Sequence, residues 1–300
     1  MTPLTGPQVR PRSAPAAPGP APRPGAGAAG RVGLALAGGR AVLALIRRDL
    51  GDRQLLRLPL LLDLVFGVVN LLVFLFISRV LTPPGAAHPL GATTYFDFVA
   101  VGIVFMLVLQ AATTQLTSRV TREQRGGTLE LLVAQPVPAS ALAVGTAAYP
   151  FLLALLRAGV YLLLLHALFG LHTGRADWWG VVAVLVAGSA AMMGIGIGLA
   201  GFAVAAGHGE AAARLLVVGV SFVSGTYFPV TALPGDLPAL TAVLPSRIAL
   251  DGLRAALSGG AWAGSALTLL AATVLLLPLS TWVFGRALRI AAARGTLTRD

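Results

Sequence analysis

Long runs of apolar residues, each bounded by polar or charged residues, dominate the chain. Each run can cross the roughly 30 Å hydrocarbon core of a bilayer, since a helix rises about 1.5 Å per residue. The pattern predicts an all-α polytopic membrane protein with six transmembrane helices. They are expected at about 58–79, 96–116, 143–169, 178–206, 211–230 and 262–285.

The segments that flank these runs have a different character. Residues 1–38 are rich in Pro, Ala and Gly, which predicts a disordered cytoplasmic tail. In residues 39–57 apolar side chains recur at three- and four-residue steps among arginines, which indicates an amphipathic interfacial helix or an extension of the first span. Residues 58–290 form the predicted six-span domain, and residues 291–300 a second cytoplasmic tail.

The stretch between the fifth and sixth runs, about 231–260, is too polar to face lipid as a span. Pro234, Pro238 and Pro245 interrupt it, and it also carries charged side chains. Backbone that is not regularly helical is tolerated at membrane depth only where protein or water shields it. We therefore expect a loop or a re-entrant helical hairpin between helices 5 and 6.

Arginine placement predicts the orientation of the chain. If the N-terminus is inside, the outer segments hold only Arg79, Arg175, Arg247 and Arg254, and most other arginines are inside. Positive charge is enriched on the cytoplasmic side of membrane proteins, so both termini are expected there. The Ala- and Arg-rich, lysine-free composition favours a high-GC bacterial genome and hence the bacterial plasma membrane.

Composition excludes several kinds of chemistry. Apolar residues make up 56 % of the chain and charged residues 11 %, and the mean hydropathy is +0.83. All 22 basic residues are arginine, so a GxxxxGK(S/T) phosphate loop is absent. The chain has no cysteine and only four scattered histidines, so no metal site is expected. No polar domain could carry a basic groove for nucleic acid.

The segment after the second run is short and densely charged. Its sequence over 117–136, TSRVTREQRGGTLELLVAQP, predicts a helix, a break at the two glycines, and a second helix that Thr128 caps and whose first turn holds Glu130. Such a unit at a membrane face suits docking on a soluble protein. An ordinary solvated loop is the alternative.

Residues 123–132, EQRGGTLELL, followed by Pro136, resemble the E-x-x-x-G-T-x-E-x-L pattern of ABC-2 type export permeases. In that family the segment lies at the inner end of the second span and contacts a separate ATPase. The resemblance implies an ATPase-coupling role here, although Gln124 departs from the usual charged residue. The residues concerned are Arg119, Arg122, Glu123, Arg125, Gly127, Thr128, Glu130 and Pro136.

A second segment resembles the other hallmark of the same family, a re-entrant outer hairpin between spans five and six. It runs over 224–234, SGTYFPVTALP, and continues to residue 254. The likeness as a whole covers about 40–290 with the same six-span plan. The hairpin residues are Ser224, Gly225, Phe228, Pro229, Pro234, Pro245, Asp251 and Arg254.

The resemblance implies the membrane subunit of an ATP-binding cassette exporter, with two permease copies, or this chain and a related permease, above a homodimer of ATPase subunits. This chain would be non-catalytic, and ATP and Mg would bind only in the partner. Membrane lipids are further expected partners. A secondary carrier and an intramembrane enzyme built on Ser221, Ser224 or Asp63 are the alternatives. The cargo is expected to be a drug-like or lipid molecule, with a polysaccharide as alternative, because no polar, aromatic-rich span suggests a sugar channel.

Three further features remain within the spans. Arg157 lies near mid-bilayer, where an arginine faces protein or water; it either pairs with Asp63, faces the cargo path, or snorkels with no transport role. Glycines at 194, 196, 198 and 201 predict close helix packing inside one protomer. Trp262 is expected at the outer membrane interface, together with Trp178 and Trp179.

Overall fold

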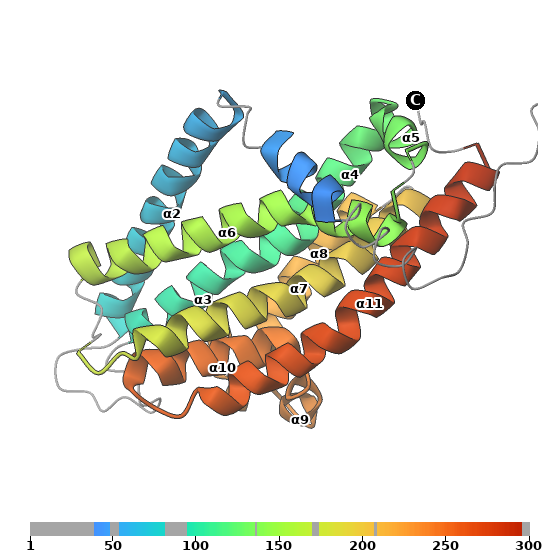
Figure 1. Ribbon diagram of the computed structural model, residues 1–300. Helices are drawn as coiled ribbons and strands as arrows, with labels where there is room; N and C mark the ends of the chain where they lie inside the picture. The colour runs from blue at the N-terminus through green and yellow to red at the C-terminus, as the bar shows by residue number, and fades with distance from the viewer. Residues whose placement is uncertain are drawn as a thin grey trace, which may run out of the picture.

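The computed structural model describes residues 39–48, 54–81, 95–135, 137–169, 174–206 and 209–295. These residues form a bundle of helices, and no strand occurs among them (Figure 1). The predicted all-α class is therefore confirmed for the described part of the chain. The predicted tail over 1–38 and residues 296–300 of the second predicted tail lie outside this part.

Four helices among the described residues are long and apolar enough to cross a membrane. The first combines α3 (Tyr95–Gln110), a π-helical turn η1 (Ala111–Gln115) and α4 (Leu116–Arg125). The others are α6 (Ala139–Phe169), α7 (Trp178–Ala206) and α11 (Ala263–Ala293).

Two further helices coincide with the first and fifth predicted spans. α2 runs over Gln54–Leu81, and its apolar portion Leu64–Val80 counts as a shorter apolar helix. α8 (Gly209–Val223) has only 15 residues. The number of membrane crossings therefore rests on these two helices.

The burial of the long helices separates a centre from a periphery. In their apolar windows, 78 % of residues are buried in the helix Tyr95–Arg125 and 72 % in α7, against 28 % in α6 and 17 % in α11. α11 lies along α7 in the bundle (Figure 1). The second and fourth predicted spans thus form the core, and the outward faces of α6 and α11 are suited to lipid.

The two ends of the bundle differ. At one end, the α5 end, α4 leads into the short helix α5 (Thr128–Val133), and the helix over residues 39–48 lies beside α4 and the start of α6 (Figure 1). At the other, the α10 end, the short segments η2 (Val230–Ala232) and α9 (Leu237–Thr241) precede α10 (Pro245–Ser258), which packs against α7.

Element boundaries differ from expectation at three places. The helix of the second span continues past residue 116 to Arg125, because helix formation does not stop where hydropathy falls. α8 ends at Val223 and not near 230, because Gly225 adopts a left-handed φ of 79°. α2 already begins at Gln54, inside the predicted interfacial segment 39–57, of which residues 39–48 are helical and 49–53 lie outside the description.

Candidate functional site

The predicted coupling segment has the expected helix–break–helix form. α4 ends at Gly126, whose N–H donates to the carbonyl of Arg122, and Gly127 then turns the chain with a φ of 70°, a conformation that favours glycine. Glu130 lies in the first turn of α5, as predicted. Pro136 lies outside the described residues.

The predicted capping role of Thr128 is wrong. The residue that precedes α5 is Gly127, and no side chain caps this helix. Instead, the Thr128 hydroxyl donates to the backbone carbonyl of Glu123, at 3.1 Å. This bond reaches back across the turn, so Thr128 ties α5 to the last turn of α4 and fixes the angle between them.

Glu123 is the centre of a small charged cluster at the α5 end. Its carboxylate lies 3.1 Å from the guanidinium of Arg48 and 3.7 Å from that of Arg119, and its side chain is only 14 % exposed. The Arg119 guanidinium also lies 5.6 Å from the ring centroid of Tyr149 on α6. Glu123 therefore joins α4 to the helix over 39–48, a partner that sequence reasoning did not assign to it.

The other charged residues of the segment face outward. Arg122, Arg125 and Glu130 are exposed, and Leu131 beside them is 69 % exposed. Gln124, at the position that departs from the family pattern, is buried, which suits a neutral side chain. The segment therefore divides into Arg119 and Glu123, held within the protein, and an outward surface of mixed charge around an exposed leucine.

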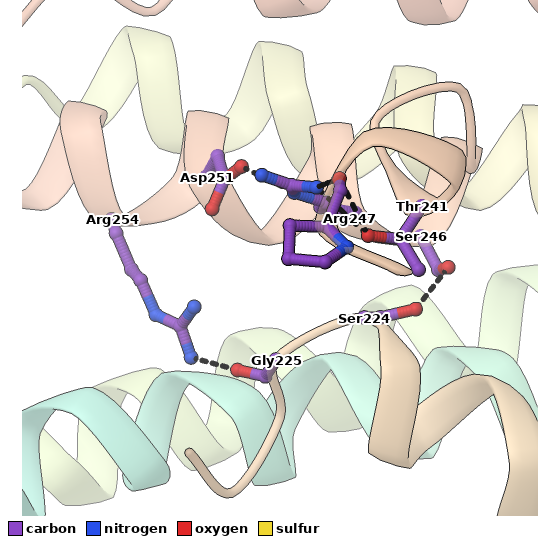
Figure 2. A network of polar contacts seen from close by, with 8 residues as sticks. Ser224, Gly225, Thr241, Ser246, Arg247, Asp251 and Arg254 are labelled. Carbon is purple, nitrogen blue, oxygen red and sulfur yellow. Dashed lines mark hydrogen bonds and ion pairs between the residues drawn. The ribbon is translucent and has the colours of Figure 1, made fainter. Parts of the chain in front are cut away.

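At the α10 end, a network of polar contacts holds the predicted hairpin residues together (Figure 2). The hydroxyl groups of Ser224 and Ser246 share a hydrogen bond of 2.5 Å. The Arg247 guanidinium donates to the carbonyl of Pro238 and to the Thr241 hydroxyl, and it pairs with Asp251 at 3.6 Å. These bonds connect α9 and α10 with each other and with the turn after α8.

Arg254 joins this network to the second span. Its guanidinium donates to the carbonyls of Gly225, at 2.8 Å, and Phe98, at 3.1 Å, and lies 3.5 Å from the Phe98 ring centroid. Burial lowers the pKa of Arg254 to about 10, and the nearby charge of Asp251 opposes this shift. The side chain stays protonated at neutral pH and binds α3, α10 and the turn after α8 together.

The remaining hairpin residues are structural. Pro229 precedes η2, Pro234 lies between η2 and α9, and Pro245 is the first residue of α10, where its missing N–H costs no hydrogen bond. The Phe228 ring lies 6.2 Å from that of Phe222 on α8.

An aromatic cluster, not evident in the sequence, lies near this turn. The Tyr227 ring stacks on Phe74 of α2 at 5.9 Å and contacts Phe222 at 5.7 Å. Its hydroxyl donates to the sulfur of Met106, and its carbonyl accepts from the Tyr95 hydroxyl. The sequence shows no obvious cluster because these rings come from segments that lie far apart in the chain.

Asp177 is a further connector that sequence reasoning missed. Its carboxylate accepts hydrogen bonds from the indole of Trp262 at 2.7 Å and from the backbone N–H groups of Trp179 and Gly180, and thus caps α7. Its own N–H donates to the Ala256 carbonyl in α10. Trp262 thus has a specific hydrogen-bond partner within the protein at the position where an interfacial residue was predicted.

The predicted pair of Arg157 and Asp63 stays a prediction, because the Asp63 side chain lies outside the described part of the structure. Arg157 is half-buried on α6. One turn later, the Tyr161 hydroxyl donates to the carbonyl of Leu64, at 3.3 Å. α2 and α6 are therefore in contact close to both residues.

Comparison with known proteins agrees with this architecture. A family model, ABC-2 type transporter, matches residues 40–258, which is well over half of the chain. No curated protein matches the chain. The chain therefore belongs to the ABC-2 type transporter family: it is a multi-pass membrane protein and the non-catalytic permease component of an ABC transporter, a class that works with an ABC ATPase.

Proposed function

We propose that the chain is the transmembrane permease of an ATP-driven exporter in the bacterial plasma membrane. In this proposal α2 and α8 also cross the bilayer, which makes six spans with both termini in the cytoplasm. The arginine-rich α5 end then faces inward, as the distribution of positive charge favours. The α9–α10 segment is the re-entrant hairpin on the outer side.

The observation that carries the proposal is the unbroken 31-residue helix Tyr95–Arg125. Near its first turn this helix forms hydrogen bonds with Arg254 and with the Tyr227 carbonyl. Both residues belong to the predicted hairpin segment 224–254, here called the hairpin region. At its last turn the helix bears Glu123 and leads into α5. A push on α4 and α5 therefore acts on a helix that runs from the coupling segment into the bundle and on to its opposite end.

The outward surface of the coupling segment, with Arg122, Arg125, Glu130 and Leu131, is the proposed contact for the ATPase. Glu123 and Arg119 anchor the segment to the rest of the permease. Two ATPase subunits would bind ATP and Mg beneath a pair of permeases, either two copies of this chain or this chain and a related one. Closure of these subunits would shift the permease between inward-open and outward-open states.

We further propose a drug-like or lipid cargo, with a polysaccharide as the alternative. The sequence supports this choice, because no polar, aromatic-rich span suggests a sugar channel.

An intramembrane enzyme gains no support from the serines considered for it. The Ser221 hydroxyl donates to the Val217 carbonyl of its own helix, and the Ser224 hydroxyl is bonded to Ser246. Among the described residues, neither contact supplies the base that a nucleophile requires. A secondary carrier is likewise less favoured, because the described helices show no pair of discontinuous spanning helices at corresponding positions of two halves.

The proposal is tested by co-purification of the permease in nanodiscs with the ATPase encoded beside it, followed by ATPase rates. The Glu123→Ala, Glu130→Ala double variant is expected to lose the complex or to uncouple ATP hydrolysis from transport. Glu210→Ala is the matched control, because Glu210 pairs with Arg214 on α8, outside the segment. If the wild-type permease binds no ATPase, or if the double variant behaves as wild type, the exporter proposal fails. The secondary-carrier alternative then becomes the favoured function.

A further inference from the structure

The second span contains an irregularity that neither the coupling segment nor the hairpin explains. Between α3 and α4, the residues Ala111–Gln115 form a π-helical turn, η1. A π-turn replaces the usual i to i−4 hydrogen bonds by longer ones and weakens the helix locally. Such turns are rare and often occur at functional positions, where helices kink.

One face of η1 is held tightly against α7. The contact is made at Gly196, where an added Cβ would overlap with the carbonyl oxygen of Ala112. No side chain separates the two backbones at this point, so they can turn about it but cannot approach further. The Ala112–Gly196 contact has the properties of a pivot.

Next to this contact, the packing of η1 against α6 and α7 is incomplete. A small cavity of about 10 Å³, the scale of one water molecule, lies there. On its α6 side it meets Pro150, which removes a hydrogen bond from the interior of that helix. Ser189 of α7 also lines it, and its buried hydroxyl has no hydrogen-bond partner among the described residues. A bend at η1 would reposition its backbone carbonyl groups and bring one within reach of the Ser189 hydroxyl.

The two arms on either side of η1 are attached to different parts of the protein. α3 is bound to the α10 end through the Phe98 carbonyl and the Tyr95 hydroxyl. α4 is bound to the helix over 39–48 through Glu123 and Arg48. α4 also packs on α7 in a buried apolar cluster that includes Val120 and Ala200. A bend at η1 would therefore slide the α4 arm along α7 without pulling the α3 arm from the α10 end.

We propose that η1 is a hinge in the second span, with the Ala112–Gly196 contact as its pivot and the cavity beside Pro150 as the packing defect that lets the turn bend. This inference rests on the proposed function, because the ATPase would drive the motion through α4 and α5. The hinge converts a push on the coupling segment into a change of angle near the middle of the bundle.

Distances between spin labels test the hinge directly. The chain has no cysteine, so labels attach only at introduced ones. One pair, Thr121→Cys with Phe202→Cys, joins the α4 arm to α7 on the α5 side of the pivot, called below it. The other, Asp97→Cys with Trp179→Cys, joins the α3 arm to α7 on the α10 side, called above it. In the complex with the ATPase, a non-hydrolysable ATP analogue is expected to change the first distance and not the second. Equal changes in both, or none, would overturn the hinge.

Filling the cavity provides the matched variants. Ala154→Leu places a larger side chain in the cavity, whereas Gly159→Leu adds the same side chain to α6 where a Cβ meets nothing within 4 Å. We expect Ala154→Leu to retain the ATPase and lose the nucleotide-dependent distance change, and Gly159→Leu to keep both. If Ala154→Leu fails to fold, Ala154→Val, which adds less volume at the same position in the cavity, takes its place and should reduce the change. A full wild-type response in either cavity variant would contradict the proposal.

A measurement on the permease alone separates this hinge from the proposed function. Without ATPase, the distance distribution of the pair below the pivot should be broader than that of the pair above it, and Ala154→Leu should narrow it. Equal widths overturn the hinge, whether or not an ATPase binds. The permease could bind no ATPase and still show a broad distance distribution for the label pair below the pivot. That result would contradict the exporter proposal and support the hinge.

Discussion

Single glycines determine how closely the helices of this bundle approach, and Gly196 is the sharpest case. Its missing side chain lets α7 touch the carbonyl of Ala112, whereas a Cβ on Gly198 would meet its nearest neighbour, the Ser280 Cβ, at 3.7 Å. We expect Gly196→Ala to lower the free energy of unfolding by about 1–3 kcal/mol, because rigid backbone cannot rotate away. Gly198→Ala should be neutral or slightly stabilising, because alanine favours helix.

Thermal unfolding of both variants in nanodiscs checks this difference. Similar melting midpoints for Gly196→Ala and Gly198→Ala would contradict the prediction, because α7 and η1 would then make room for the added Cβ without loss of stability. The sequence predicted close packing by this glycine run inside one protomer, and the contacts of Gly196 with η1 and of Gly201 with Phe284 on α11 confirm it. The sequence could not show which glycine is critical, because that depends on the carbonyl that each one faces.

Residues with distant partners also escaped sequence reasoning. The pairing of Arg48 with Glu123 and of Asp177 with Trp262 joins positions 75 and 85 residues apart. Nothing in the local sequence identifies these partners. An arginine is common at a membrane face and a tryptophan at the start of a membrane helix, so neither residue type points to a specific contact. The coupling segment itself was predictable because its pattern is contiguous.

At the level of elements, hydropathy located the helices well where the polar boundary coincides with a helix end. α7 runs over Trp178–Ala206, as predicted for the fourth span. Hydropathy did not locate the helix end where apolar residues continue past it. This happens after Val223, because the turn at Gly225 ends α8. Hydropathy gave no sign of η1, because the residues AATTQ suit an ordinary helix as well as a π-turn.

Asp177 connects three elements, and its ionisation should make their association depend on pH. The hydrogen bond from Trp262, followed by those from the backbone, lowers the pKa of Asp177. Because the folded-state pKa lies below the unfolded value of about 3.9, its stabilisation is present above that value and is lost as the pH falls through the folded pKa. Asp177→Ala should therefore melt below wild type near neutral pH, and the difference in melting temperature should narrow as the pH falls below the unfolded value.

The matched control for this prediction is Asp236→Ala. Asp236 precedes α9 but makes no side-chain cap hydrogen bond, and it is exposed. Its replacement should leave the melting temperature close to that of wild type at each pH. A gap for Asp177→Ala that stays constant down to the lowest pH would show that packing, and not the carboxylate, carries the effect.

For the whole molecule, the arrangement of the two ends requires that the α5 end and the α10 end face opposite sides of the membrane. Trp179, at the start of α7, is 83 % exposed, and Arg125, at the end of α4, is also exposed. Because the chain has no cysteine, each can be replaced singly by cysteine and labelled in intact cells with a membrane-impermeant thiol reagent. The arginine distribution predicts labelling of Trp179→Cys at once and of Arg125→Cys only after permeabilisation.

The same experiment decides whether α8 crosses the bilayer. With 15 residues, α8 would rise about 22 Å, less than the hydrocarbon core, so crossing requires the turn over 224–229 to lie within membrane depth, shielded by α10 and Arg254. Glu210→Cys should then label only after permeabilisation and Leu237→Cys in intact cells. Labelling of both from the same side would make α8 a non-crossing helix, reduce the span count to five or fewer, and place the two termini on opposite sides if α2 crosses.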